Sequence, residues 1–190
     1  MALVESTMLP LGTPAPAFRL PEPATGKLVS LDDFATSRGV LVTFICNHCP
    51  YVQLIREELA RFGRDYLPRG LAVLAINAND AATHPADSPE KMKEEVARHG
   101  YVFPYLHDAS QDVARAYHAA CTPDFFLFDA SRQLVYRGQF DDARPGNGIA
   151  PSGHDLRAAA DAVLAGLPVS TRQKPGIGCN IKWKADGAPA

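Results

Sequence analysis

The sequence predicts an α/β fold in which a central mixed β-sheet is flanked by helices, and three features carry this prediction. Two apolar segments rich in β-branched residues, Val40–Ile45 and Leu71–Ile76, are typical of strands buried on both faces of a sheet. Segments with helical periodicity alternate with these strands. Two further apolar runs, Phe125–Phe128 and Leu134–Tyr136, flank a polar turn and predict an antiparallel edge.

The chain has 190 residues, of which 46% are hydrophobic and 21% are charged. This composition is typical of a globular protein, and the length suits one domain with a sizeable core. We therefore expect a single domain over residues 1–190, with its core at about 10–168 and a C-terminal extension over 169–190. The formal net charge of −2 and the scattered basic residues give no reason to expect a nucleic acid or a membrane as a partner.

The N-terminal elements are defined by a turn and by apolar periodicity. Phe18–Leu20 and Leu28–Leu31 predict an N-terminal β-hairpin whose turn lies at Ala24–Gly26. A helix is expected to begin at Pro50, because a proline in the first turn loses no hydrogen bond. Its apolar stripe recurs at steps of three and four residues, at Val52, Ile55, Leu59, Phe62 and Tyr66.

The later elements are marked mainly by helix caps. Residues 77–88 read as a polar loop, after which Ser88 and Pro89 predict a helix that reaches about His99. Ser110 and Ser152 are the expected N-caps of two further helices. A short strand is expected at residues 105–106, and residues 169–190 are only weakly patterned.

A Cys-x-x-Cys motif stands where the first buried strand meets the first helix. Cys46 and Cys49 enclose Asn47 and His48, and Pro50 follows directly. A helix N-terminus favours negative charge, so we expect this position to favour the Cys46 thiolate, which is the reactive form of the side chain. Cys49 is about one turn away and can attack a mixed disulfide on Cys46 to form a Cys46–Cys49 disulfide. His48 adds a donor or a positive charge nearby.

Two other interpretations of the motif stay open. A Cys-x-x-Cys pair is also half of a zinc site, but Cys121 and Cys179 are single and far apart in sequence, so no second ligand pair is present. The cysteines can also be inert residues of the core. Four cysteines are too few for a disulfide-rich secreted scaffold, and we favour a redox pair. No metal is assigned to the isolated histidines: His84, His99, His107, His118 and His154.

A second segment, Cys121-Thr122-Pro123-Asp124, directly precedes the Phe125–Phe128 strand. A proline is tolerated at a strand entrance because it need not donate to the sheet there. If the Thr122–Pro123 bond is cis, it forms a fixed bend beside the Cys-x-x-Cys motif and offers a backbone edge to an incoming disulfide. An ordinary trans proline is the alternative.

Taken together, the two segments resemble those of the thioredoxin superfamily, specifically its peroxiredoxin-like AhpC/TSA (redoxin) branch with a Cys-x-x-Cys motif. The resemblance covers roughly residues 10–165 and implies a thioredoxin-like fold with the N-terminal β-hairpin as an extension. It also implies that Cys46 attacks the substrate, that Cys49 resolves the intermediate and that Pro123 is cis.

Several residues depart from individual members of this superfamily. Ile45 stands where thioredoxins have a tryptophan, whereas a histidine before the second cysteine is similar to disulfide isomerases. Thr43 matches the peroxiredoxin threonine that helps to bind peroxide, but Gly39 stands where those proteins have a proline. The segment Gly178–Trp183, GCNIKW, resembles a C-terminal motif of cytosolic peroxiredoxin-like proteins.

Two further cysteines and a charged loop are weaker candidates for residues of the active site. Cys121 is expected to lie near the site and to be buried and inert, since a cysteine packs like a small hydrophobic residue. Cys179 is a candidate additional resolving thiol, although a packing role is an equal alternative. The loop after the last strand is expected to be solvated, with substrate recognition as the alternative, and carries Arg137, Asp141, Asp142 and Arg144.

These observations predict a thiol–disulfide oxidoreductase that exchanges disulfides with protein or small thiol substrates and draws on an external thiol reductant system. Cys46 and Cys49 are the expected catalytic residues, supported by Thr43, Asn47, His48, Pro50, Thr122 and Pro123. The first alternative is a thiol peroxidase, in which peroxide converts Cys46 to a sulfenic acid that condenses with Cys49. The second is a metal-binding module or metallochaperone that uses both cysteines and a histidine.

Two further expectations concern cofactors and location. No cofactor is expected. The N-terminal segment lacks the basic and apolar regions of a signal peptide, and Glu5 interrupts it early, so we expect a cytoplasmic protein.

Overall fold

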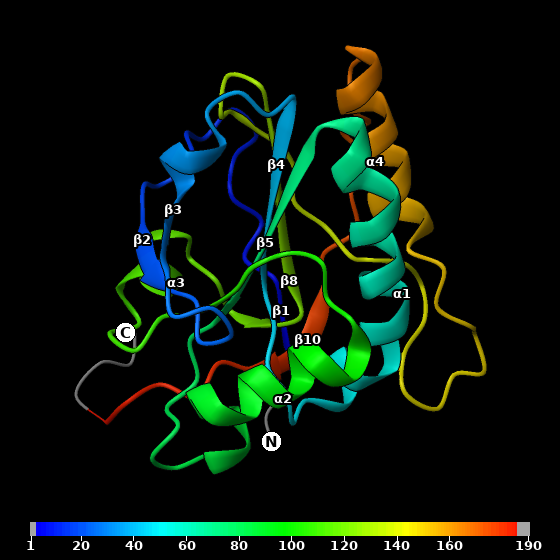
Figure 1. The fold of residues 1–190 in the computed structure, drawn as a ribbon. Helices are drawn as coiled ribbons and strands as arrows, with labels where there is room; N and C mark the ends of the chain where they lie inside the picture. Colours follow the sequence, from blue (N-terminus) through cyan, green and yellow to red (C-terminus); the bar gives the residue numbers. More distant parts are fainter. Residues whose placement is uncertain (1–2, 186–190) are drawn as a thin grey trace.

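The computed structural model describes residues 3–185 and is built around a mixed β-sheet (Figure 1). Five strands form this sheet in the order β6-β5-β4-β8-β9. β5 is parallel to both β4 and β6, whereas β8 is antiparallel to its neighbours β4 and β9. Their bounds are β4 (Gly39–Phe44), β5 (Leu71–Asn77), β6 (Tyr105–His107), β8 (Asp124–Asp129) and β9 (Leu134–Tyr136). The predicted central mixed sheet is therefore present.

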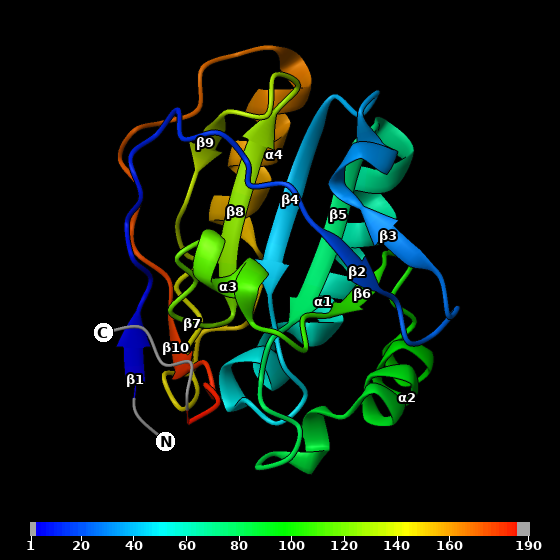
Figure 2. The same ribbon diagram turned by 90° about the vertical axis from the view of Figure 1, so that its left-hand side faces the viewer.

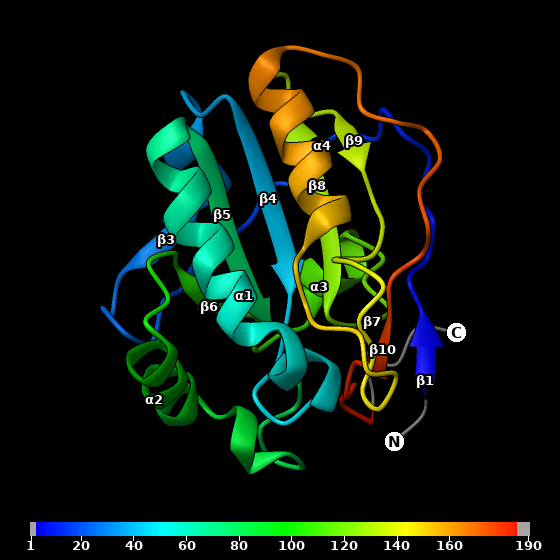
Figure 3. The ribbon, with the colours of Figure 1, turned by 90° about the vertical axis from the view of Figure 1, so that its right-hand side faces the viewer.

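Helices α1 (Pro50–Tyr66) and α4 (His154–Ala165) cover one face of the sheet, in front of it in Figure 3. The apolar stripe predicted for α1 is buried against the sheet. Cys46, Cys49 and Cys179 belong to the same buried cluster as this stripe. The cysteines are thus part of the core on the helix-covered face, at the end of α1 where the chain arrives from β4.

The opposite face is covered by a β-hairpin and a short helix (Figure 2). β2 (Arg19–Pro21) pairs antiparallel with β3 (Leu28–Ser30), as the sequence predicts, and a 3-10 turn follows at Leu31–Phe34. α3 (Asp112–Ala116) lies beside them. Aromatic rings fill the space between these elements and the sheet, with Tyr117 in contact with Phe18, Phe44, Phe126 and Phe128.

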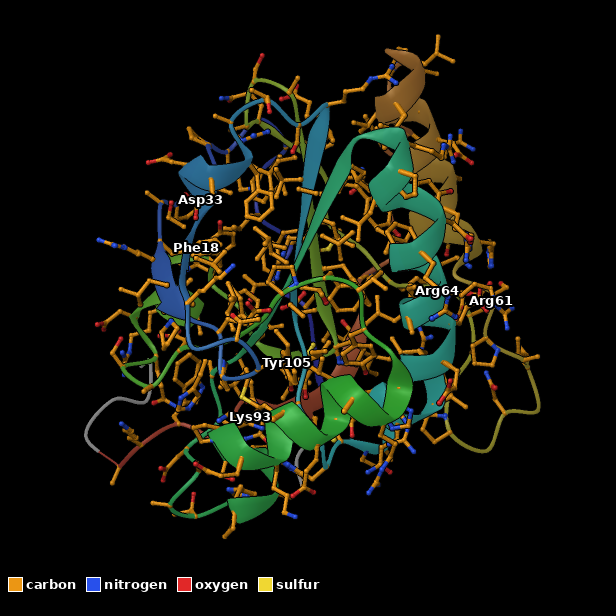
Figure 4. All side chains as sticks on the ribbon, in the orientation of Figure 1. Phe18, Asp33, Arg61, Arg64, Lys93 and Tyr105 are labelled. Atoms are coloured by element: carbon orange, nitrogen blue, oxygen red, sulfur yellow. The ribbon has the colours of Figure 1, made fainter. Side chains whose placement is uncertain are left out.

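The helices present polar side chains outward. Figure 4 shows Arg61 and Arg64 on the outer side of α1 and Lys93 on the outer side of α2 (Pro89–His99), while Tyr105 points into the interior. In residues 3–185, no helix has both the length and the apolar character that crossing a membrane requires.

The helix caps agree with the sequence in one case and differ in two. Ser88 caps α2 and accepts a hydrogen bond from the Lys91 N–H, and Gly100 ends the helix in a left-handed conformation. The N-cap of α3 is Gln111 and not Ser110, and this helix stops at Ala116. The N-cap of α4 is Gly153 and not Ser152. The Asp141 carboxylate binds this end of α4, accepting the N–H groups of Ser152 and Gly153 at 2.6 Å each.

The charged loop is not solvated as expected, because two of its residues are buried. Asp141 is 1% exposed and serves the start of α4. Arg137 is 0% exposed and lies 3.4 Å from the equally buried Asp124 carboxylate. Asp142, by contrast, is at the surface and pairs with Lys174 at 2.8 Å. The charged residues of this loop therefore serve two purposes: Arg137 and Asp141 make buried contacts, and Asp142 forms an ion pair at the surface.

The C-terminal segment contains a strand that the sequence pattern does not indicate. β10 (Ile177–Asn180) lies between β1 (Leu3–Glu5) and β7 (Cys121–Thr122), antiparallel to both (Figure 2). Gly178 permits this pairing, because a Cβ at this position would lie 2.0 Å from the Thr122 carbonyl oxygen. The weakly patterned tail is therefore hydrogen-bonded to the segment that precedes Pro123.

Candidate active site

The two motif cysteines are placed by the end of a strand and the start of a helix. β4 ends at Phe44, and α1 begins at Pro50 with Cys49 as its N-cap. Across from them, Thr122 contacts both sulfurs. The Cys46 Sγ is 3.3 Å from the Thr122 Oγ1, and the Cys49 Sγ donates to the Thr122 carbonyl oxygen at 3.1 Å. The Thr122–Pro123 peptide bond is cis.

The sulfurs are almost completely buried. Cys46 is 1% exposed and Cys49 is 0% exposed. The four cysteines, all within the described residues, form no disulfide. The pair is thus present as two buried thiols of the core, and Thr122 is a polar partner of both.

The two thiols titrate together. The hydrogen bond between their sulfurs lowers the pKa of Cys49 to about 5, and this hydrogen bond, burial and the Asp87 carboxylate raise the pKa of Cys46. Thr122 acts in the opposite direction, because its hydroxyl lowers the pKa of Cys46 and its carbonyl accepts a hydrogen bond from the protonated Cys49 thiol. The pair therefore loses one proton easily and shares the other between its sulfurs. The expected effect of the helix N-terminus on Cys46 stays a prediction; the structure shows that Cys49 is the N-cap of α1.

A buried carboxylate lies directly behind the motif. Asp87 accepts the Asn47 N–H at 2.7 Å, and its second oxygen is 2.6 Å from the His48 Nδ1 and 2.8 Å from the Asn79 Nδ2. Burial alone raises the pKa of Asp87, but hydrogen bonds from His48, Asn79 and Asn47 outweigh it and hold the pKa below its usual value. Asp87 therefore remains ionised beside the thiols.

Asn47 and His48 both anchor the motif to its surroundings. The Asn47 side chain donates to the Ala86 carbonyl at 2.8 Å and accepts the Tyr105 hydroxyl at 3.0 Å. The His48 ring stacks on His84, with 5.0 Å between the ring centres. Burial, followed by the charges of His48 and Lys182, lowers the pKa of His84. The loop over residues 77–88 is thus part of the site and is more than a polar connection.

The comparisons with known proteins can now be set beside this geometry. The model of the AhpC/TSA family matches residues 11–137. The chain belongs to the AhpC/TSA family. Membership in this family indicates oxidoreductase chemistry in general and agrees with the resemblance seen in the sequence. No curated protein matches the chain.

Solved structures place this AhpC/TSA protein among thioredoxin-like folds. A hypothetical protein from Sinorhizobium meliloti 1021 is 59% identical, with a TM-score of 0.94 over 95% of this chain and 98% of that chain. An uncharacterized conserved protein from Geobacillus kaustophilus is 52% identical, with a TM-score of 0.95 over 97% and 98%. The thioredoxin domain of a thiol-disulfide oxidoreductase from Bacteroides vulgatus is 20% identical, with a TM-score of 0.60 over 79% and 97%, and shows the shared fold.

Other residues singled out in this AhpC/TSA sequence lie at varying distances from the sulfurs. Pro50 is the first residue of α1, as expected. Thr43 is fully buried in β4, and within residues 3–185 its hydroxyl has no hydrogen-bond partner. Cys121 is buried behind Thr122, where its sulfur is 3.8 Å from the Ser6 Oγ. Burial, together with the Asp124 charge, raises the pKa of Cys121.

One group of side chains has the donor types of a metal site. Cys46, His48 and Asp87 each offer a ligand atom, and these atoms lie within 4.8 Å of one another. This group differs from the set considered in the sequence, because a carboxylate takes the place of Cys49. The His48 Nδ1 is already held by Asp87 in a 2.6 Å contact, which a metal ion would have to replace.

Asp87 was not predicted from the sequence as a residue of the site, because it was placed only in the loop before Ser88, the N-cap of α2. A signal was available: Asn77, Asn79 and Asp87 follow a buried strand that is parallel to the strand before the motif. The carboxyl ends of neighbouring parallel strands meet at one edge of a sheet, where ligand sites gather. With β5 paired to β4, polar residues at and after the end of β5 come close to Cys46.

Proposed function

We propose that this AhpC/TSA protein is a thiol–disulfide oxidoreductase with Cys46 and Cys49 as its redox pair. The observation that carries the proposal is the contact of both sulfurs with Thr122, at 3.3 Å and 3.1 Å, beside the cis Pro123. This arrangement holds two thiols against one backbone edge. It also provides a hydrogen-bond acceptor for the Cys49 thiol and a hydroxyl donor for Cys46.

The first step requires the shared proton to lie on Cys49. The Cys49 thiol then donates to the Thr122 carbonyl, and the Cys46 thiolate is stabilised by the Thr122 hydroxyl. The Cys46 sulfur attacks one sulfur of a substrate disulfide, and the other substrate sulfur leaves as a thiolate. The product is a mixed disulfide between Cys46 and the substrate.

The second step uses Cys49 as the resolving thiol. Once Cys49 loses its proton, its sulfur attacks the Cys46 sulfur, and the remaining substrate sulfur leaves as a thiolate. Two electrons have then passed to the substrate, and a Cys46–Cys49 disulfide remains. An external thiol reductant system returns the pair to its dithiol form, and the reverse sequence oxidises dithiols.

The test is turnover of insulin and of a mixed glutathione disulfide by the wild-type protein and two variants. We expect Cys46→Ser to abolish activity, because it removes the attacking sulfur. We expect Cys49→Ser to accumulate a mixed disulfide on Cys46, detected as an adduct on the tryptic peptide of residues 39–56. Cys121→Ala is the matched control, since this thiol lies behind Thr122 and is expected to leave turnover unchanged. Normal turnover by Cys49→Ser would refute the resolving role.

A thiol peroxidase is the second candidate, favoured by one observation. The Thr43 hydroxyl is buried near the end of β4 and has no protein hydrogen-bond partner among residues 3–185, so its hydrogen-bonding capacity is unused there. Stopped-flow oxidation by hydrogen peroxide separates the two candidates. Oxidation of Cys46 no faster than that of free cysteine would eliminate the peroxidase. A rapid reaction that Thr43→Val slows, while insulin reduction is absent, would favour it.

The metal-binding alternative has its own test. Elemental analysis of the purified protein would detect zinc or copper held by the Cys46, His48 and Asp87 group. A metal that co-purifies stoichiometrically and is lost in both Cys46→Ser and His48→Ala would support a metal centre over the redox pair.

A further inference from the structure

The strand pairing of β10 places Cys179 on the same side of its sheet as the motif cysteines. Cys179 is the direct cross-strand partner of Thr122 in the antiparallel pair of β10 and β7. Direct partners in such a pair present their side chains on the same face, with close Cβ atoms. The Thr122 side chain contacts Cys46 through its hydroxyl, so the Cys179 side chain points toward the same site.

Close approach of the two backbones brings Cys179 within reach. Gly178 lies against the Thr122 carbonyl, where any side chain would collide with the oxygen. That same carbonyl accepts the hydrogen bond from Cys49 at 3.1 Å. Cys49 and Cys179 therefore both lie next to Thr122, and both belong to the same buried cluster.

Cys179 and Cys49 affect each other's titration. Cys46 and, to a smaller extent, Cys179 lower the pKa of Cys49, and burial followed by Cys49 raises the pKa of Cys179 to about 12. Cys49 also shares a hydrogen bond with Cys46. Cys46, Cys49 and Cys179 thus form a group around Thr122: its hydroxyl contacts Cys46, its carbonyl accepts a hydrogen bond from Cys49, and its cross-strand partner is Cys179. Cys121 is excluded from it, because side chains alternate along β7 and its sulfur lies beside Ser6.

We propose that Cys179 is a third redox-active thiol, which accepts the disulfide from the Cys46–Cys49 pair and stores it as a Cys49–Cys179 disulfide. This inference rests on the proposed function, since the Cys46–Cys49 disulfide must form first. It extends that function because the disulfide can occupy a second position, Cys49–Cys179, which does not include Cys46, the sulfur that attacks the substrate.

The exchange balances within the chain. The Cys179 sulfur, after losing its proton, attacks the Cys49 sulfur; the Cys49–Cys179 bond forms and the Cys46–Cys49 bond breaks. Cys46 leaves as a thiolate and takes up the proton that Cys179 lost. One disulfide is exchanged for another, so no outside oxidant or reductant is needed. Cys46 is again a thiol while the protein remains oxidised.

The consequence is a Cys46 that can react with a second substrate before the protein is reduced. The Cys49–Cys179 bond would also tie the N-cap of α1 to β10 covalently. The resolving thiol of the next cycle would then be engaged, so a mixed disulfide on Cys46 would persist until the reductant restores Cys49. The stored disulfide therefore separates substrate capture from resolution.

Peptide mapping of the oxidised wild-type protein is the first test. The protein is oxidised with one equivalent of diamide, alkylated and digested with trypsin without reduction. A Cys46–Cys49 disulfide stays inside peptide 39–56, whereas a Cys49–Cys179 disulfide links that peptide to peptide 173–182. We expect the linked pair, with Cys46 alkylated. Oxidised protein in which peptide 173–182 is always alkylated overturns the proposal.

Two variants and a control complete the experiment. Cys46→Ser leaves the other two thiols and is expected to form the linked pair directly under native conditions; failure to do so also overturns the proposal. Cys179→Ala is expected to lose the linked pair and to keep the Cys46–Cys49 disulfide. Cys121→Ala is expected to leave both products unchanged. An oxidised wild-type protein with neither disulfide would contradict the proposed function itself, which keeps the two failures distinct.

Discussion

Asp87 is the residue whose position most affects the chemistry of the site. Its side chain is 0% exposed and fixes the Asn47 backbone and the His48 ring behind the sulfurs. The carboxylate stays ionised there, because the hydrogen bonds that it accepts hold its pKa below the usual value. A negative charge beside a thiol opposes formation of a thiolate. Asp87 therefore restrains Cys46 even as it positions the motif.

This balance predicts the effect of Asp87→Asn. Removing the carboxylate takes away one of the causes that raise the pKa of Cys46, after the hydrogen bond with Cys49 and burial. We expect alkylation of Cys46 by iodoacetamide to acquire a midpoint about one pH unit lower than in the wild-type protein. The measurement is the pH dependence of alkylation, with Cys46 and Cys49 separated by fragmentation of peptide 39–56.

Asp80→Asn is the matched control for this experiment. Asp80 lies in the same loop and carries the same charge, but its carboxylate binds Thr83 and the Ala82 N–H. The control is expected to leave the alkylation midpoint unchanged. A midpoint in Asp87→Asn that stays in place or moves to higher pH would contradict the assigned effect of the carboxylate.

Residues of the site were predictable where the chemistry is local in sequence. Cys46 and Cys49 form a motif of four residues, and Thr122 and Pro123 are adjacent to each other. Asp87 was not predictable in the same way, because its contacts with Asn47 and His48 join segments that are distant in the chain. Its role depends on how β5 lies beside β4, which no local pattern encodes.

At the scale of elements, β10 depends on one glycine. Gly178 faces the Thr122 carbonyl, and an added Cβ would lie 2.0 Å from that oxygen. The strand can accommodate a methyl group only by moving away from β7. Since β10 carries Cys179 and β7 carries Thr122, such a movement would separate Cys179 from Thr122 and from the motif cysteines beside it.

Gly178→Ala is therefore expected to lower the free energy of unfolding by about 2 kcal/mol through overpacking. We also expect the Cys179 thiol to react faster with Ellman's reagent, because β10 separates from its neighbour. Urea unfolding and thiol titration measure the two effects. Gly146→Ala is the control: its added Cβ meets nothing within 4 Å, so only the cost of its positive φ remains. Equal losses in both variants would argue against the steric role of Gly178.

The elements divide by the strength of their local signals. β4 and β5 were predicted because each is a continuous apolar run, which is typical of a strand buried on both faces. α1 was predicted because its apolar residues recur with the period of a helix. β10 was not, since Ile177–Asn180 has no alternating pattern and pairs with a two-residue strand and the N-terminal segment. The cap of α4 was misassigned for a related reason: the carboxylate of Asp141, in the preceding loop, satisfies the start of α4 in place of the Ser152 side chain.

For the whole molecule, a buried ion pair joins three parts of the chain. Asp124 at the start of β8 accepts the Ser6 hydroxyl at 2.7 Å and lies 3.4 Å from an Arg137 nitrogen. Both charged side chains are 0% exposed. Burial raises the pKa of Asp124, and the Arg137 charge opposes this shift. The pair thus connects the N-terminal segment to the strand that follows Pro123.

Arg137→Met is expected to cost about 3–5 kcal/mol of unfolding free energy at neutral pH, because it leaves a buried carboxylate without its counter-charge. A carboxyl group with a raised folded pKa contributes stability below its unfolded pKa and loses that contribution as the pH rises through the folded value. The loss in Arg137→Met should therefore shrink at acidic pH. Urea unfolding at neutral and acidic pH measures this change.

The double variant Asp124→Asn/Arg137→Met tests the same pair from the other side. It removes both charges, so its loss of stability at neutral pH should be smaller than that of Arg137→Met and should depend less on pH. A double variant that is as unstable as the sum of its single variants would show that the two side chains act independently.

The pairing of β10 with β7 also bears on how the protein is made. Translation delivers Cys46 and Cys49 long before β10, which is the last strand in the described part of the chain. During that interval the nascent polypeptide carries its motif without the strand that packs beside it. The motif thiols of the growing chain are therefore more accessible to oxidation than those of the folded protein, which are 1% and 0% exposed.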